Sequence, residues 1–152
     1  MTLLSTLSTL LLVAQVPPCT VTPTAPLLPG VINRATGTEP AWVATDNSIT
    51  WTAIGMKTLW VFKAARRVHV TGREITTGAV VRFQRSLNNP ISDDMTIDDA
   101  RRESVLPGGA DRQLLDSYTF HPSAVFYPDP GCYRFQVDID HGVHHITVQV
   151  RW

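Results

Sequence analysis

The sequence predicts an all-β protein, an antiparallel β-sandwich that carries one long loop insertion. Three observations support this prediction. Residues 133–152 alternate between apolar and polar side chains, several shorter segments before them are rich in β-forming residues, and Gly, Pro, Asp and Asn separate the segments. Two-residue alternation is typical of strands that bury one face, and several short strands with turns between them are typical of a sandwich.

An apolar leader opens the chain. Residues 2–14 read TLLSTLSTLLLVA and carry no charged side chain. A transmembrane span needs about 20 apolar residues, so this run matches the hydrophobic region of a secretory signal instead. A signal normally starts with Lys or Arg, whereas the first basic side chain here is Arg34. The alternative is a buried N-terminal helix or strand. We predict a signal peptide over residues 1–16, no transmembrane span, and a secreted, periplasmic or cell-surface protein.

A proline-rich segment follows the leader. Five prolines lie between positions 17 and 29. Proline cannot continue a helix, and it removes a backbone donor from a strand ladder. We therefore expect residues 17–38 to form an N-terminal segment tied to a β-sandwich domain over residues 39–152. The roughly 135 residues that remain after the leader suit one domain with one core.

Short β-rich segments then follow one another along the chain. Two of them flank an Asp-Asn pair at positions 46–47, and both residue types favour a turn. In a later segment Val68 and Val70 share one face, while polar side chains share the other. Glycines and polar residues separate these segments. The expected strands cover residues 42–45, 48–54, 57–63, 66–71 and 79–85.

The C-terminal residues carry the clearest strand signal. Apolar side chains recur at every second position, and Gly142 offers a turn between the two halves because glycine adopts positive φ at little cost. This alternation is typical of an antiparallel sheet that packs on one side. We expect the hairpin to lie at the centre of the sandwich. Its predicted inward side chains are Tyr133, Phe135, Val137, Ile139, Ile146, Val148, Val150 and Trp152.

Residues 88–116 interrupt this rhythm. They combine Pro, Gly and charged residues without a sustained apolar period. Two aspartates at 98–99 precede two arginines at 101–102 by three or four positions, a spacing that favours one or two helical turns. We interpret residues 88–116 as an exposed insertion between strands. We predict that it is the most mobile and least buried part of the mature chain.

The chain has two cysteines, Cys19 and Cys132. After export they can pair, because oxidising compartments permit disulfides, and two cysteines allow one intramolecular pairing. Two alternatives stay open. One is a pair of free buried thiols. The other is lipidation of Cys19, although Pro17 and Pro18 stand where a lipidation signal has small residues. A bridge would stabilise the fold by about 4–5 kcal/mol, because it closes a loop of more than a hundred residues.

Three short motifs stand out along the mature chain. CTVTPTAP begins at Cys19, KTLWVF precedes VHVTGREI, and FYPDPGCYRFQV lies near the C-terminus. Together they resemble a group of uncharacterised bacterial secreted proteins and lipoproteins with an Ig-like β-sandwich. The resemblance implies an Ig-like fold, a bacterial envelope location and a Cys19–Cys132 disulfide preceded by a turn at 128–131. This chain has Tyr133 where tryptophan is usual in the group. The resemblance implies no activity.

Histidines at the final turn are the candidate metal ligands. His141 and His145 can converge at a hairpin end, and a third ligand from another loop would complete a Cu or Zn site. Adjacent His144 and His145 point to opposite faces of a strand, so solvated histidines are the simpler interpretation. The aspartates at 93, 94, 98 and 99 lack the spacing of a calcium loop.

Motifs of covalent catalysis are missing from the sequence. Neither G-x-S-x-G nor S-x-x-K occurs, and the sequence proximity of His121 and Ser123 does not indicate a triad. Four tryptophans offer flat apolar surfaces for a sugar or a protein, although tryptophan more often packs in a core. These four are Trp42, Trp51, Trp60 and Trp152.

The charges of the chain balance. It has 13 Lys and Arg against 13 Asp and Glu, which argues against a nucleic-acid groove or binding to an anionic membrane surface. We predict a non-enzymatic exported β-sandwich, a monomeric binding or structural module of the bacterial envelope. It needs no cofactor, and its partner is an unknown protein or envelope component. The alternative is a periplasmic Cu/Zn-binding or metal-dependent protein that uses the His141–His145 turn.

Overall fold

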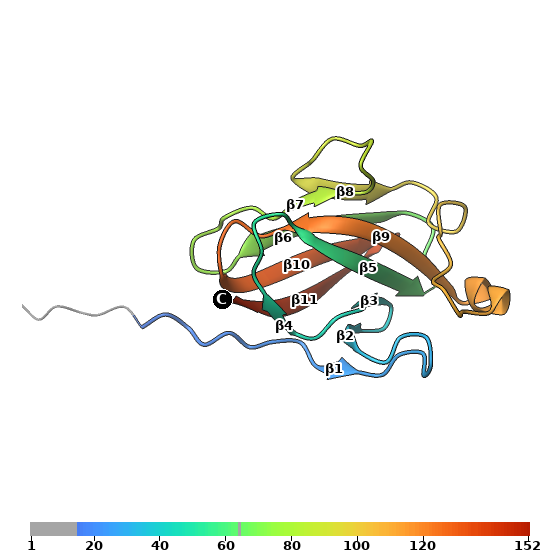
Figure 1. Ribbon diagram of the computed structural model, residues 1–152, viewed down its shortest axis with the longest axis horizontal. Helices are drawn as coiled ribbons and strands as arrows, with labels where there is room; N and C mark the ends of the chain where they lie inside the picture. Colours follow the sequence, from blue (N-terminus) through green and yellow to red (C-terminus); the bar gives the residue numbers. More distant parts are fainter. Residues whose placement is uncertain (1–14, 64) are drawn as a thin grey trace, which may run out of the picture.

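Two β-sheets pack face to face in the computed structural model of the protein (Figure 1), which describes residues 15–63 and 65–152. Within these residues the one helical element is a short 3₁₀-helix, η1 (Arg112–Asp116). The prediction of an all-β sandwich is therefore confirmed. The predicted signal peptide, 1–16, lies almost entirely outside the described residues. No helix in the described part is long and apolar enough to cross a membrane.

One sheet has six antiparallel strands in the order β1-β2-β3-β5-β9-β7. The two long strands β5 and β9 pair along the whole of β5, from Met56↔Val125 to Lys63↔Tyr118. The strands are β1 (Thr24–Ala25), β2 (Ala35–Thr38), β3 (Ala41–Val43), β5 (Met56–Lys63), β7 (Arg82–Gln84) and β9 (Tyr118–Phe126).

The other sheet has five strands in the order β4-β11-β10-β6-β8. One pair departs from the predicted antiparallel arrangement: β4 runs parallel to β11, from Gln149↔Ser48 to Arg151↔Thr50. After β3 the chain crosses from the first sheet to the edge of the second, where it forms β4. No hairpin connects β4 to β11, so the crossing connection sets the direction of β4. The strands are β4 (Ser48–Thr50), β6 (Val68–Glu74), β8 (Asp94–Ile97), β10 (Gly131–Ile139) and β11 (Gly142–Arg151).

Aromatic side chains fill the space between the sheets. Trp60 of β5 is fully buried and meets Phe135 of β10 edge-on, with ring centroids 5.2 Å apart. Phe83 of β7 packs against both rings. The Trp60 indole N–H donates to Ser123 Oγ at 2.9 Å, so burial leaves this donor satisfied.

The predicted C-terminal hairpin is confirmed as β10 and β11, and β10 is the central strand of its sheet. The predicted inward side chains from Tyr133 to Val150 are buried. The prediction for Trp152 is wrong, since this side chain is 85% exposed. The alternation stops there because β11 ends at Arg151, and Trp152 packs edge-on against Trp51 at 5.4 Å, outside the core.

The prediction of one exposed loop over residues 88–116 is wrong in part. Residues 94–97 form β8, whose side chains Met95 and Ile97 are buried in the core, as is Ala100. Charged neighbours hide this short alternation in the sequence. The remainder is irregular, and the Glu103 N–H donates to the Asp99 carbonyl in one helical turn, as the charge spacing predicts.

Strand β9 has no counterpart in the sequence-based prediction. Its polar residues Thr119, His121 and Ser123 are all buried, whereas the intervening Phe120 faces a separate apolar cluster on the outside of the sheet. The pattern is thus the reverse of an ordinary half-buried strand. Pro122 has no backbone N–H, and it is tolerated because the backbone polar groups of the even-numbered residues of β9 point away from β5. The Phe120 carbonyl, for example, accepts a hydrogen bond from the Val105 N–H and not from β5.

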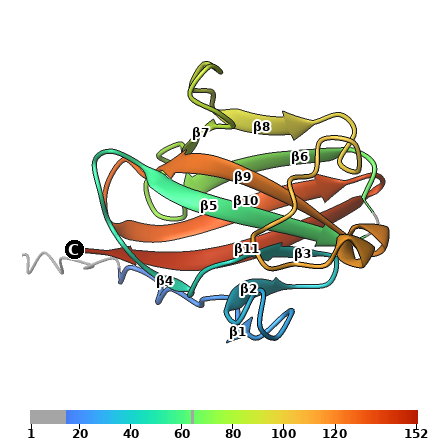
Figure 2. The same ribbon diagram turned by 45° about the vertical axis from the view of Figure 1, so that its right-hand side comes forward.

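The proline-rich segment contributes directly to the sandwich. Besides β1 and β2, it supplies an extended stretch ahead of β1 that runs near β4 and β11 (Figure 2). Thr22 in this stretch is hydrogen-bonded to β11. The Thr22 N–H donates to the Thr147 carbonyl at 2.9 Å, and the Thr147 N–H donates to Thr22 Oγ1 at 2.8 Å. Thr147 is buried as a result, although alternation places it on the polar face. The N-terminal segment is therefore hydrogen-bonded to both sheets of the sandwich.

Candidate functional site

Cys19 and Cys132 form a disulfide, with Cα atoms 5.5 Å apart and 113 positions of sequence between them. Neither cysteine is free, so the alternative of two thiols is wrong for this structure. A sulfur in this bond also cannot carry a lipid. The bridge holds the start of the N-terminal segment against the first residues of β10. The disulfide is typical of a compartment outside the cytoplasm.

A buried carboxylate supports the same region. Glu74 accepts hydrogen bonds from the N–H groups of Thr76, Thr77 and Cys132, and from the Thr77 hydroxyl. Burial alone would raise the pKa of Glu74, but these hydrogen bonds outweigh burial and lower the pKa. The carboxylate therefore has a structural explanation. The sequence analysis did not single out Glu74.

The two candidate metal ligands are exposed. His141 lies in the β10–β11 turn, and His145 lies on the outer face of β11, in register with Gln136. His144 is half-buried, in keeping with the predicted opposite orientation. In the part of the chain that the structure describes, no group of three His, Cys, Asp or Glu side chains is arranged to hold a metal ion. No observation here favours the metal-binding alternative.

His69 instead lies between two aspartates. Its Nε2 is 2.9 Å from Asp94 Oδ2, and its Nδ1 is 3.4 Å from Asp138 Oδ2. The three residues come from the adjacent strands β6, β8 and β10, so the cluster ties these strands together on the outer face. Because all three side chains are partly exposed, the interaction adds little to stability.

The tryptophans pack against other side chains. Trp42 is buried beside Tyr118 in the outer apolar cluster, with ring centroids 6.1 Å apart. Trp51 donates its indole N–H to the Tyr127 carbonyl at 3.0 Å. Trp152 alone of the four is largely exposed. The four residues do not gather on one surface, since Trp60 is in the inner core.

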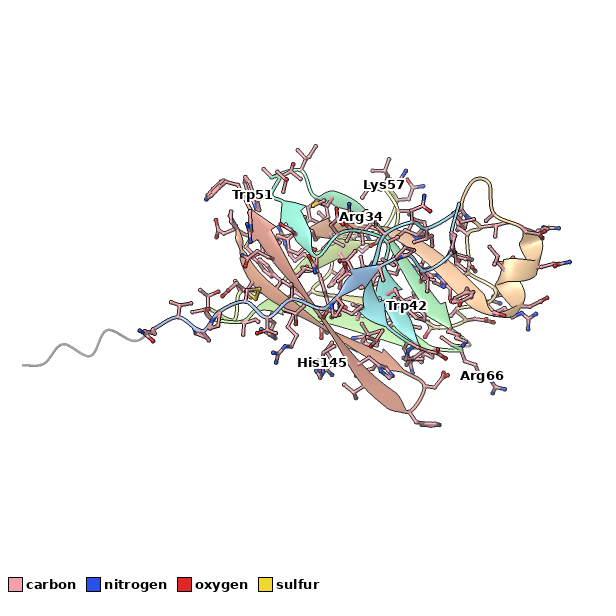
Figure 3. All side chains as sticks on the ribbon, turned by 90° about the horizontal axis from the view of Figure 1, so that it is seen from below. Arg34, Trp42, Trp51, Lys57, Arg66 and His145 are labelled. Atoms are coloured by element: carbon pink, nitrogen blue, oxygen red, sulfur yellow. A yellow bond between two sulfur atoms is a disulfide. The ribbon has the colours of Figure 1, made fainter. Side chains whose placement is uncertain are left out.

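The loops at one end of the sandwich surround a polar hollow of about 560 Å³. We call this end the distal end, because it lies opposite residues 15–20, as the position of Arg66 shows in Figure 3. At this end the β5–β6 connection, the turn after β8 and the residues before β9 come together. The residues that line the hollow are Ala65, Arg66, Asp98, Asp99, Arg101, Leu115, Asp116, Ser117 and Thr119.

Hydrogen bonds hold the walls of the polar hollow in place. The Ala100 N–H donates to the Arg66 carbonyl at 2.7 Å, which joins the turn after β8 to the β5–β6 connection. Asp140 Oδ1 accepts from the N–H groups of Arg66 and Arg67 at 3.2 and 3.1 Å. Arg101 Nη2 lies 3.4 Å from Asp116 Oδ1 across the opening. The protein's own hydrogen bonds therefore fix the walls of the hollow.

Two buried polar side chains of β9 lie at or near the hollow, namely Thr119 in its lining and His121 deeper in the sandwich. Thr119 lines the hollow and is 4% exposed, and its hydroxyl has no hydrogen-bond partner among the described residues. His121, the next inward-facing residue of β9, is 1% exposed. The Ala100 backbone approaches its ring, but neither ring nitrogen makes a well-formed hydrogen bond among the described residues. Buried polar groups are usually paired, so these two residues require an explanation.

The surroundings of His121 favour its neutral form. Burial lowers the pKa of His121 to about 4, and the nearby Arg85 guanidinium acts in the same direction. The Glu103 carboxylate opposes this shift. Arg85 Nη1 lies 2.6 Å from Glu103 Oε2, and this contact, with the Asp99 N–H, lowers the pKa of Glu103 against the effect of burial. At neutral pH the inner face of β9 therefore carries an uncharged imidazole.

We expect His121 to make the fold acid-sensitive. The pKa of His121 lies below its ordinary value of 6.5, so the unfolded chain binds a proton first as the pH falls. The contribution of neutral His121 to the free energy of unfolding is fully present above pH 6.5. It is lost as the pH falls from 6.5 to about 4, by up to about 3 kcal/mol. Urea unfolding at a series of pH values measures this loss. His121→Leu should remove most of this slope, whereas His141→Gln, at an exposed position, should keep it.

A separate apolar groove of about 540 Å³ crosses the outer face of the six-stranded sheet. Leu59 and Pro122 form its floor, and residues 31–34 and 105–107 form its walls. Lys57 and Arg34 stand at its rim, and Arg34 forms an ion pair with Asp46. The groove is the more apolar of the two concavities.

Comparison with solved structures identifies a chain of similar fold. A crystal structure described as a putative lipoprotein from Bacillus anthracis superposes with a TM-score of 0.53 at 12% sequence identity. The match covers 88% of this chain and 87% of that one. At this identity the likeness concerns the fold. No protein-family model matches this chain, and no curated protein matches it.

The polar hollow was not predicted from the sequence. Its residues come from three separate segments, and only the sheet topology brings them to one end. One signal was available, since Thr119, His121 and Ser123 recur at every second position between apolar residues. Such a polar alternation marks either an exposed strand face or a buried polar row, and the sequence does not distinguish these two cases.

Proposed function

We propose that this protein is a non-enzymatic binding module of the bacterial envelope, with an Ig-like β-sandwich that presents the polar hollow to its ligand. The position of the hollow carries this proposal. The disulfide attaches the N-terminal segment at one end of the sandwich, and the residues that line the hollow lie at the other end. The described part of the N-terminal segment therefore leaves the hollow uncovered.

Two further observations support the proposal. The fold is similar to that of a bacterial chain described as a putative lipoprotein, and the disulfide suits an exported protein. Loops that cluster at the ends of a sandwich are the usual binding surfaces of Ig-like domains. His121, two residues along β9 from Thr119, is 1% exposed, so its ring is closed to a molecule in the hollow.

Site-specific photo-crosslinking in living cells tests this function. A photoreactive amino acid at Arg101, which is exposed on the rim of the hollow, should capture an envelope component. The matched control is Ile54, which is 86% exposed in the β4–β5 loop at the opposite end. Capture from position 54 but not from position 101 would contradict the proposal. A chain that stays in the cytoplasm would also contradict it.

A further inference from the structure

The apolar groove on the outer face of the six-stranded sheet is a concavity separate from the polar hollow. Its volume of about 540 Å³ lies within the usual range of small-molecule sites, about 300–1,000 Å³. Eight of the twelve residues that line it are apolar, two are cationic, and none of these described residues is acidic. Such a lining favours an apolar ligand, and a charged group on that ligand would have to be negative.

The floor of the groove is a sheet face, so it presents side chains and not backbone hydrogen-bonding groups. Leu59 and Pro122 are in register on the paired strands β5 and β9. The Leu59 carbonyl accepts from the Ala44 N–H at 2.8 Å, and Pro122 has no N–H. An extended peptide on this floor would bury backbone groups without partners, which is costly. A hydrocarbon chain has no such groups, so the floor suits a hydrocarbon chain better than a peptide.

The outer face of β5 changes from apolar to charged along the strand. Val61, Leu59 and Lys57 are two residues apart, so their side chains form one row on that face. Val61 is fully buried in the outer apolar cluster, Leu59 is half-buried at the floor of the groove, and Lys57 is exposed at the rim. A ligand that follows this row would contact apolar side chains and end at an ammonium group.

Lys57 is the cation that such a ligand would meet. It forms no ion pair among the described residues. The other cation of the groove, Arg34, is paired with Asp46, and Lys63 on the same face of β5 is paired with Glu39. Figure 3 shows Lys57 and Arg34 on one side of the sandwich. An anionic group at the rim would therefore give Lys57 the partner that the other two cations already have.

We propose that the apolar groove binds the hydrocarbon chain of a fatty acid and that Lys57 pairs with its carboxylate. The chain lies over Leu59 and Pro122, and removal of the apolar surfaces from water supplies most of the affinity. The ion pair is exposed at the rim, so it contributes mainly to the choice of head group. This inference goes beyond the binding function proposed above, because it assigns a ligand to a second concavity.

NMR titration of the ¹⁵N-labelled protein with octanoate and decanoate, below the concentrations at which they form micelles, tests the inference. Decanoate should shift the amides of residues 31–34, 57–59 and 105–106, and should leave those of residues 98–101 in the polar hollow unchanged. Each buried methylene increases affinity by up to about fourfold, so decanoate should bind about tenfold more tightly than octanoate. Decyltrimethylammonium has the same chain with a cationic head and should bind more weakly than decanoate.

Variants separate the contribution of the head group from that of the chain. Lys57→Gln should weaken decanoate binding about two- to fivefold, the effect of one exposed ion pair, without weakening decyltrimethylammonium binding. The matched control Lys63→Gln removes a lysine from the same face of β5 outside the groove and should bind decanoate like the wild type. Val105→Asp adds a carboxylate at a groove position that is 56% exposed, so it should fold normally and bind decanoate about tenfold more weakly.

Three results would overturn the inference. If decanoate shifts no amide of the groove before micelles form, a fatty acid is not the ligand. If decanoate and decyltrimethylammonium bind equally well, Lys57 does not select a carboxylate head. If the groove amides shift when the protein alone is concentrated, a second copy of the chain covers the groove instead.

Discussion

Replacement of Val137 by aspartate should unfold the protein. Val137 is fully buried in the central strand β10, in register with Val70 of β6 and His144 of β11. A carboxyl group there must lose its hydration, and its cross-strand neighbour that can carry a positive charge is His144, so the measurement is made at about pH 8, where an ordinary histidine is neutral. Burial of an unpaired carboxylate raises its pKa by about 3–5 units, which corresponds to about 4–7 kcal/mol. This approaches the whole stability of a typical domain, about 5–15 kcal/mol.

Circular dichroism and urea unfolding measure this effect. The matched control is Val143→Asp, the same substitution at a side chain on β11 that is 58% exposed. We expect the control to keep a cooperative transition near that of the wild type. If Val137→Asp unfolds at the same urea concentration as the control, the hairpin does not face the core as the structure has it.

Loss of the disulfide should have the second largest effect on stability. The bridge joins residues 113 positions apart, and closing a loop of this length restricts the unfolded chain by about 4–5 kcal/mol. We expect the double variant C19S/C132S to melt about 10–20 °C below the wild type. Calorimetry of the oxidised protein, the reduced protein and the variant checks this prediction.

The loss should also have a local signature. Without the bridge, the hydrogen bonds between Thr22 and Thr147 are the nearest remaining attachment of the N-terminal segment to β11. Hydrogen exchange at these two amides should accelerate more than exchange in β10. Residues 98–101 of the polar hollow lie at the other end, so their amides should keep their protection. A melting temperature equal to that of the wild type would contradict the stabilising role of the bridge.

A strand could be predicted from the sequence where its own residues alternate between apolar and polar side chains. The hairpin β10–β11 was predictable because each strand buries one face, so the pattern repeats every two residues. Strand β8 was missed because only Met95 and Ile97 carry the signal and aspartates surround them. Strand β9 was missed because its inner face is polar at Thr119 and His121.

The sequence by itself determined the class of the fold, the central hairpin and the pair of cysteines that forms the bridge. The first two features follow from the side-chain alternation within single strands. The third follows because the chain has two cysteines, which allow one intramolecular pairing. The tertiary structure alone decided the parallel pairing of β4, the sheet edge that Thr22 covers and the polar hollow. These depend on which distant segments meet, because only the sheet topology brings Arg66, Asp98 and Thr119 to one hollow.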